Sequence, residues 1–402
     1  MSPTSDTPSS PPAEQPDFSL VLGGPLYQFF RRSHLSDDSL RPLLRRILSV
    51  SLFCWLPLLV LSAIEHHLVR GSTAIPFLLD IEAHVRFLVA MPLLIAAEVL
   101  VHQRLGKLVN LFVDRGLVSK DDLPRFEAAR QAALRLRNSM VAELMVIAIV
   151  YGLGILVVWR KYLALDAATW HLVPTAAGSQ LGLAGMWFAY VSLPVFQFLL
   201  LRWYFRLFIW ARFLWQVSRI RLKLVPTHPD RTGGLGFLSA TAPAFALLVM
   251  GQGALLAGQL SNRILFLGAA LPDFKYEILM YVVFVLVAVT GPLLVFVPQL
   301  VLARRVGRAE YGNLAQRYMR EFDTKWVRGD APAGEPLIGS PDIQSLADMG
   351  NSYAVLQEMS ISPVSKGMVL QLAAITFAPL LPLVLTMMPL EELLKKLFGI
   401  LI

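Results

Sequence analysis

Seven apolar stretches divide this chain, and most are long enough for a helix that crosses a bilayer. They are residues 47–64, 87–101, 141–159, 181–201, 237–260, 278–302 and 368–388. Because a bilayer core takes about 20 apolar residues in a helix, the pattern predicts an all-α membrane protein, a bundle of about seven transmembrane helices. The second stretch is short. It spans only if Arg86 and His102 snorkel or if flanking turns extend the helix.

Lysine and arginine are unevenly distributed between these stretches. Segments 1–46, 102–140, 202–236 and 303–367 hold 28 of the 36 basic residues, and the alternate segments hold the other eight. Cytoplasmic loops carry such an excess. The bias therefore predicts a cytoplasmic N-terminus and, after seven spans, an external C-terminus. In the alternative, Pro389 ends the last helix and residues 391–402 lie flat on the membrane.

The composition narrows the class of protein. Apolar residues make up 55% of the chain and charged residues 16%, which is too apolar for an ordinary soluble domain. The net charge of +8 follows from the sidedness of the loops, so it does not indicate a nucleic-acid partner. A single cysteine, Cys54, excludes an intramolecular disulfide and a cysteine-based metal site. No cofactor motif is present.

The segments outside the spans predict a simple organisation. Residues 1–17, rich in proline, serine and acid, predict a disordered tail, and residues 18–402 a single membrane domain. Residues 303–367 predict a cytoplasmic helical hairpin, whose second helix begins at Ser340-Pro341-Asp342 with a hydroxyl cap, a proline and an acid. The apolar face of that helix is expected at Ile343, Leu346, Ala347, Gly350, Tyr353 and Ala354.

Five polar residues within the spans are candidates for permeation or ion binding. Glu98 and Glu143 each lie near a cytoplasmic end, at a shared depth. They form a cation or proton site if they converge, or interfacial ion pairs with arginines such as Arg202 and Arg206 if they do not. The other three candidates lie in the glycine- and proline-interrupted fifth and sixth spans. Such spans line transport sites or simply pack closely; these candidates are Gln252, Gln259 and Gln299.

The segment 65–86 is dense in residue types that bind metals. Imidazole and carboxylate groups together suit zinc or another divalent ion, but no known ligand spacing is matched. Two adjacent histidines also cannot face one point on a regular helix. The sequence therefore predicts no metal site, and the weak candidates are His66, His67, Asp80, Glu82 and His84.

The sharpest local motif is PTHPDRTGGLGF, residues 226–237, which joins a basic helix to the fifth span. Two prolines stop the preceding helix. Backbone N–H groups, a helix dipole and Arg231 together indicate a site for a phosphate or lipid headgroup. In the alternative, the segment is a tight turn in which Asp230 caps the helix and pairs with Arg231. The headgroup candidates are His228, Asp230, Arg231, Gly233, Gly234 and Gly236, with Arg202 and Arg206 after the fourth span.

Two segments, HPDRTGGLGF at 228–237 and GSPDIQSLADMGNSY at 339–353, resemble parts of uncharacterised multi-pass inner-membrane proteins of bacteria. The resemblance implies a bacterial inner membrane. It implies no activity and no site residue.

Three functions are compatible with these observations. The first, which the sequence favours, is a channel or transporter for a small ion or solute, with a path through the fifth and sixth spans and with Glu98 and Glu143 near its inner mouth. The second is a non-transporting scaffold or sensor, whose basic cytoplasmic face binds anionic lipid or a partner; spans packed without a continuous polar path favour it. An enzyme acting on lipid is the least favoured, because it needs a cavity open to the bilayer near His228 and Asp230. A homo-oligomer is compatible with each function, since a pore can lie within one chain or between chains.

Overall fold

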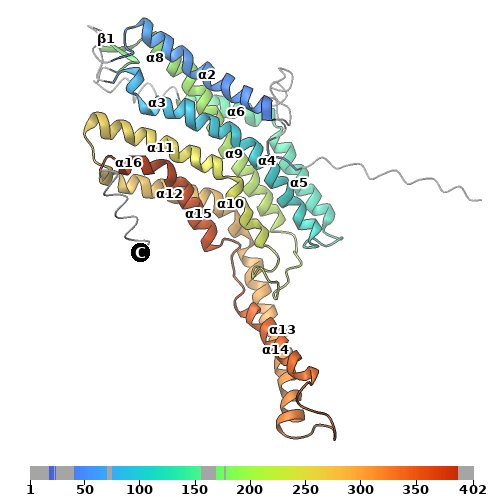
Figure 1. Cartoon of the computed structure of the whole chain (residues 1–402). Coiled ribbons are helices and arrows are strands. Elements are labelled where there is room, and N and C mark those ends of the chain that lie inside the picture. The colour runs from blue at the N-terminus through green and yellow to red at the C-terminus, as the bar shows by residue number, and fades with distance from the viewer. Residues whose placement is uncertain are drawn as a thin grey trace, which may run out of the picture.

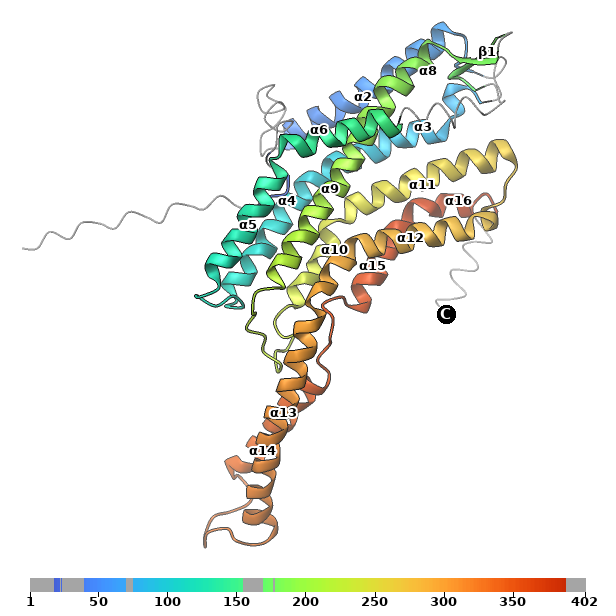
Figure 2. The same cartoon turned by 180° about the vertical axis from the view of Figure 1, so that it is seen from behind.

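The computed structural model describes residues 18–21, 23, 40–69, 75–154, 169–175 and 178–387. Of these described residues, 76% are helical and 2% lie in strands. Long helices form a bundle, and two helices, α13 and α14, project from one end of it as an arm (Figures 1 and 2). We call that end of the bundle the arm end. The predicted N-terminal tail, 1–17, lies outside the described residues.

The described helices include five that are long and apolar enough to cross a membrane, and a sixth if a bent pair counts as one span. The five run over Leu43–Ile64, Ile81–Asp114, Leu183–Val217, Leu271–Val327 and Lys366–Val384, and the pair Gly236–Ala244 and Ala246–Leu267 is bent by 44°. The described residues are mostly helical and include five or six helices of spanning length, which is consistent with the predicted all-α membrane protein. A seventh span is not confirmed: the third stretch is described only as a short apolar helix, Met140–Gly152, and residues 155–168 lie outside the described part.

The α-helices of the described residues have the following bounds. In the first half of the chain they are α2 (Leu40–Ile64), α3 (Ile81–Val85), α4 (Met91–Asp114), α5 (Leu123–Arg137) and α6 (Met140–Ile149). In the second half they are α8 (Leu183–Trp187), α9 (Leu193–Val217), α10 (Thr241–Ala244), α11 (Ala246–Leu267), α12 (Lys275–Thr290), α13 (Val297–Phe322), α14 (Pro341–Gln357), α15 (Lys366–Phe377) and α16 (Leu381–Val384). Two short antiparallel strands, β1 (Leu172–Thr175) and β2 (Gly178–Leu181), lie at the end opposite the arm (Figure 1).

Several spans are longer than their apolar stretches. The short second stretch lies inside a 34-residue helix, in which a π turn over Arg86–Ala90 joins α3 to α4. The flanking turns therefore supply the length that the stretch lacks. The sixth stretch lies inside a 57-residue helix, in which a 3-10 turn at Gly291–Phe296 joins α12 to α13. The first helix of the arm is thus the continuation of a candidate span.

Glycines on α11 allow its neighbours to approach closely. A Cβ atom at Gly253 would lie 2.5 Å from the carbonyl oxygen of Thr376 in α15, and one at Gly258 would lie 3.1 Å from the Cβ of Val85 in α3. Small residues at such contacts let membrane helices pack backbone to backbone. Close packing is therefore what these glycines provide on α11.

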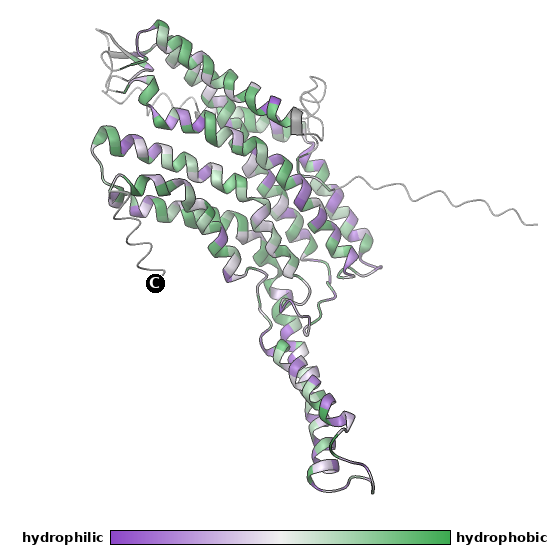
Figure 3. Ribbon diagram, in the orientation of Figure 1, coloured by the Kyte–Doolittle hydropathy of each residue, from purple (hydrophilic) through white to green (hydrophobic). Residues whose placement is uncertain are grey.

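Hydrophobic side chains cover both the interior and the outer face of the bundle. The interior is aromatic, with Trp203, Trp210 and Phe213 of α9 fully buried. On the outer face, apolar residues of α12 such as Met280 and Val287 remain exposed, which suits contact with lipid. Figure 3 shows that hydrophilic residues gather instead on α5 and along the arm.

The arm consists of the second half of α13 and of α14, which lie side by side (Figures 1 and 2). Helix α14 begins where the sequence predicts: Ser340 is the N-cap, its hydroxyl accepts from the N–H of Asp342, and Pro341 follows. The predicted apolar face is only partly covered. Leu346 and Tyr353 are half-buried, but Ile343, Ala347, Gly350 and Ala354 are exposed.

The covered side of α14 instead includes Met349, which is half-buried, and Leu356, which is buried. The physical reason is that α14 packs on the single helix α13 within the arm, and one neighbour covers only a narrow stripe of a helix.

Candidate functional site

Glu98 lies in a cluster of buried charges inside the bundle. It belongs to α4, and only 4% of its surface is exposed. One carboxylate oxygen pairs with Arg46 of α2, and the other lies 2.7 Å from Nη2 of Arg206 on α9. The guanidinium of Arg206 also lies over the ring of Trp203, 4.8 Å from its centre. Glu98 therefore joins three helices, and both of its oxygens already have cationic partners.

Glu143 faces a different environment from Glu98. Both of its carboxylate oxygens are buried, and neither has a hydrogen-bond partner among the described residues. They face a cavity of about 20 Å³ that is also lined by Arg137, Ser139 and Arg202. A cavity of this size holds one water molecule. Arg202 interacts electrostatically with both glutamates. The guanidinium of Arg202 is thus a common neighbour of both carboxylates. The two glutamates do not converge on an open site for a cation.

The three candidate glutamines lie in three separate environments. Gln252 is buried, and its Oε1 accepts from the hydroxyl of Tyr281 at 3.5 Å. Gln259, on the same helix, is exposed. Gln299 donates from Nε2 to the carbonyl oxygens of Ser218 and Ile220, at 2.5 and 2.7 Å, just after α9 ends. Its amide therefore satisfies carbonyl groups that the end of a helix leaves unpaired.

In the segment 65–86, most of the weak metal candidates have protein partners of their own. Asp80 caps α3 through the N–H of Ala83, and it also accepts from Asn262 and Trp170, both at 2.7 Å. His67 contacts the main-chain oxygen of Trp170, Glu82 pairs with Arg86, and His84 accepts from Trp55. His66 lies in the turn just after α2, with a positive φ of 58°. Among the described residues, no three metal-ligating side chains lie close enough to hold an ion.

Asp230 organises the glycine-rich motif by accepting backbone hydrogen bonds. Its Oδ1 accepts from the N–H groups of Thr232 and Gly234, and its Oδ2 accepts from Gly236 at 2.8 Å. Burial alone would raise the pKa of Asp230, but these three N–H groups outweigh that effect and hold the pKa below its ordinary value. The N–H groups that could bind an external anion are therefore turned toward Asp230. His228 also contacts this carboxylate, at 2.9 Å.

The glycine-rich motif also joins the bundle to the chain just after α14, where the arm meets the bundle. Nη2 of Arg231 lies 2.9 Å from Oε2 of Glu358, and the carbonyl of Arg231 accepts from the N–H of Ser360 at 2.7 Å. The turn itself requires glycine, because Gly233 and Gly234 have φ of 64° and 100°. Arg231 therefore pairs with the residue after α14, not with Asp230. We call this joint, residues 226–236 with 357–361, the arm base.

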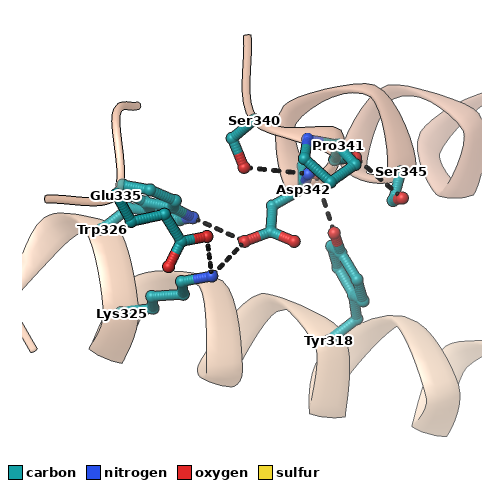
Figure 4. Close-up of polar contacts among 8 residues, drawn as sticks. All are labelled: Tyr318, Lys325, Trp326, Glu335, Ser340, Pro341, Asp342 and Ser345. Atoms are coloured by element: carbon teal, nitrogen blue, oxygen red, sulfur yellow. Dashed lines mark hydrogen bonds and ion pairs between the residues drawn. The ribbon is translucent and has the colours of Figure 1, made fainter. Parts of the chain in front are cut away.

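The second motif closes the other end of the arm (Figure 4). Oδ2 of Asp342 accepts from Nζ of Lys325 at 2.8 Å and from Nε1 of Trp326 at 2.9 Å. The hydroxyl of Tyr318 donates to the main-chain oxygen of Asp342, and Lys325 also pairs with Glu335 at 2.7 Å. We call Tyr318, Lys325, Trp326, Glu335 and Asp342 the tip clasp. Both distinctive motifs of the sequence therefore fix the arm, one at its base and one at its tip.

The tip clasp should open in acid. Hydrogen bonds from Lys325 and Trp326 hold the pKa of Asp342 below its ordinary value of 3.8. A carboxyl with a lowered folded pKa stabilises the fold above its unfolded pKa and loses that effect as pH falls through the folded value. Hydrogen bonds from Asp342 and Glu335 raise the pKa of Lys325, so the ammonium persists when the solution becomes alkaline.

We therefore expect the fluorescence of Trp326, taken as the difference from a Trp326→Phe variant, to stay constant between about pH 5 and pH 9 and to change in stronger acid. Asp342→Asn should show the acid form of the signal already at neutral pH. An acid transition that persists unchanged in Asp342→Asn would contradict this assignment.

No protein-family model, curated protein or solved structure matches this chain.

Proposed function

We propose that the protein is a non-transporting scaffold or sensor of a bacterial inner membrane, which binds anionic lipid through its basic face. The observation that carries the proposal is the separation of the polar groups within the spans. Both carboxylate oxygens of Glu98 pair with arginines, and Gln252 accepts a hydrogen bond from a tyrosine. Gln299 donates to main-chain carbonyls just after α9 ends. A permeation path needs polar groups that face one common cavity. These groups instead hold neighbouring helices together.

The arm supports a scaffold or sensor in a second way. It continues a candidate membrane span, because α12 and α13, joined by a 3-10 turn, belong to one 57-residue helix. Its base is tied to the bundle by the Arg231–Glu358 pair, and its tip is closed around Asp342. A rigid element that runs from the bilayer into solution can display a binding surface at a fixed position, or transmit a change in the membrane.

The charge distribution supports anionic lipid as the ligand class. The segments with 28 of the 36 basic residues include the arm and α5. Helix α5 lies at the arm end of the bundle, and the arm projects from that end. By the positive-inside rule this end, with the N-terminus, faces the cytoplasm. Each lysine or arginine near an anionic surface adds about 1 kcal/mol of attraction. The resemblance of segments 228–237 and 339–353 to bacterial inner-membrane proteins agrees with this location.

Ion flux through the purified protein in liposomes tests the proposal. We expect no flux above that of protein-free liposomes for potassium, sodium, chloride or protons, at several voltages and pH values. We also expect anionic phospholipid to be enriched over zwitterionic phospholipid in the lipid that copurifies with the protein. Selective flux that requires the protein would refute the proposal.

A channel or transporter is the second candidate, and one observation favours it. The buried carboxylate of Glu143 has no hydrogen-bond partner among the described residues and faces a water-sized cavity beside Arg202. Ionisable groups within membrane spans commonly mark ion or proton paths. If the liposomes show flux, Glu143→Gln should reduce it, whereas Glu277→Gln, on the exposed side of α12, should not.

A further inference from the structure

Three arginines line an open cavity where α13 leaves the apolar part of its helix. The cavity has a volume of about 400 Å³, and its walls are Val301, Arg304, Arg305, Arg308 and Ile361. Ile361 belongs to the arm base, and the other four residues lie outside both the arm base and the tip clasp. The arginine spacing of one and four residues puts Arg304 and Arg308 on one side of the helix. The chain thus concentrates three guanidinium groups around one solvent-filled space.

The positive charge of this cavity is not balanced by nearby carboxylates. Arg304 and Arg308 both donate to one main-chain oxygen, that of Gln357, at 3.0 and 3.2 Å. Within the described part of the chain, none of the three arginines forms an ion pair, and Nε of Arg304 is buried without a hydrogen-bond partner. The nearest acid in sequence to Gln357, Glu358, is paired with Arg231. Guanidinium donors therefore remain for an anionic ligand.

The position of the cavity indicates which anion fits. Val301 lies at the end of the apolar stretch 278–302, and Ile361 lies just before Lys366–Val384, another candidate span. Both side chains are more than 40% exposed. The cavity therefore combines an apolar wall on the bilayer side with donors that match phosphate oxygens, since the planar guanidinium binds phosphate in a bidentate manner.

We propose that Arg304, Arg305 and Arg308 form a binding site for the phosphate of an anionic phospholipid headgroup. Val301 and Ile361 contact the glycerol and the first acyl carbons, and the arginines contact the phosphate. The site deepens the proposed function, on which it rests for the orientation of the arm end, by giving that function a specific lipid site. Two of its arginines also bind the last residue of α14, so an occupied site couples the lipid to the arm.

The decisive variant is Arg305→Gln. Arg305 is exposed and has no hydrogen bond or ion pair with another described residue, so its loss leaves the contacts of the arm intact. The matched control is Arg317→Gln, which removes the same charge from an exposed position farther along α13. The double variant Arg304→Gln/Arg308→Gln removes the donors to Gln357 as well, and it should weaken binding more than either single change.

The full-length protein in a non-ionic detergent is titrated with dioctanoyl phosphatidic acid, dioctanoyl phosphatidylcholine and inorganic phosphate, with bound ligand counted by native mass spectrometry. We expect saturable binding of one phosphatidic acid per chain, weakened about fivefold or more by Arg305→Gln and less than about twofold by Arg317→Gln. Equal weakening by both variants, or binding that does not saturate, would overturn the site. Phosphatidylcholine that binds as tightly as phosphatidic acid would also overturn it.

Inorganic phosphate separates the two sources of this chemistry. If it binds as tightly as phosphatidic acid and depends on Arg305, the phosphate site stands and its ligand is a soluble phosphate. The outcome is independent of the flux measurement. Binding at Arg305 together with protein-dependent flux would refute the scaffold and keep the site, whereas neither binding nor flux would refute the site and keep the scaffold.

Discussion

Replacing Glu98 with glutamine is expected to lower the free energy of unfolding by about 3–5 kcal/mol, the cost of leaving a buried ion pair without one partner. The carboxylate is the acceptor for Arg46 and Arg206, and its own side chain is only 5% exposed. Without it, two guanidinium groups whose side chains are only 11% and 4% exposed lose their common anion. Arg202 adds a third positive charge nearby.

Thermal unfolding in detergent, followed by circular dichroism, measures this effect. The control is Glu277→Gln, which makes the same chemical change at an ion pair with Arg263 whose two side chains are 50% and 39% exposed. An exposed pair contributes about 0–1 kcal/mol. The double variant Glu98→Gln/Arg206→Gln should recover part of the loss, because it removes one of the two cations that Glu98 neutralises. A Glu98→Gln protein as stable as the control would contradict the role of this cluster.

The same variant distinguishes the two candidate functions. In a scaffold, Glu98→Gln lowers stability and leaves the permeability of liposomes unchanged. In a channel or transporter that uses this carboxylate, flux per folded molecule changes as well. Flux must therefore be normalised to the amount of folded protein in each sample.

Features that depend on local sequence were predictable. Hydropathy locates five or six helices of spanning length, and the start of α14 follows from Ser340, Pro341 and Asp342, because a cap is formed by residues adjacent in the chain. The third stretch is not confirmed as a span. The apolar face of α14 was predicted in part, because periodicity gives the apolar side but not how much of it a neighbour covers.

Arg206 was already a candidate partner of the glutamates, and it pairs with Glu98. Most other partners of polar side chains could not be predicted, because they depend on how distant helices are rotated against each other. Gln299 meets the carbonyl of Ser218, 81 residues away, and Asp80 meets Asn262, 182 residues away. Arg231 forms an ion pair with Glu358 rather than with its neighbour Asp230. Each of these residues has the chemistry of a site, but in the fold each one joins two segments. Asp80 directly before Ile81 and Glu82 was a visible N-cap pattern, and it could have indicated the structural role.

The second large effect is expected at Asp230, whose replacement by alanine should destabilise the arm base by about 2–4 kcal/mol. Three backbone N–H groups, those of Thr232, Gly234 and Gly236, lose their acceptor at once. A hydrogen bond to a charged group contributes about 1.5–3 kcal/mol, and three that share one acceptor are not additive. Because Ser360 donates to the carbonyl of Arg231 in the same turn, the end of α14 should loosen with it.

Hydrogen exchange of the protein in lipid nanodiscs locates this effect. Amides of residues 226–236 and 357–361 should exchange faster in Asp230→Ala, while those of α9 keep the rates of the unmodified protein, because the change is confined to the arm base. Asp230→Asn keeps one acceptor oxygen and should fall between the two. Asp330→Ala, on the exposed loop of the arm, is the matched control and should leave the arm base unchanged. If the amides of the arm base exchange at the same rate in Asp230→Ala as in Asp330→Ala, the carboxylate does not hold the turn. The N–H groups of the turn are then available to an external anion.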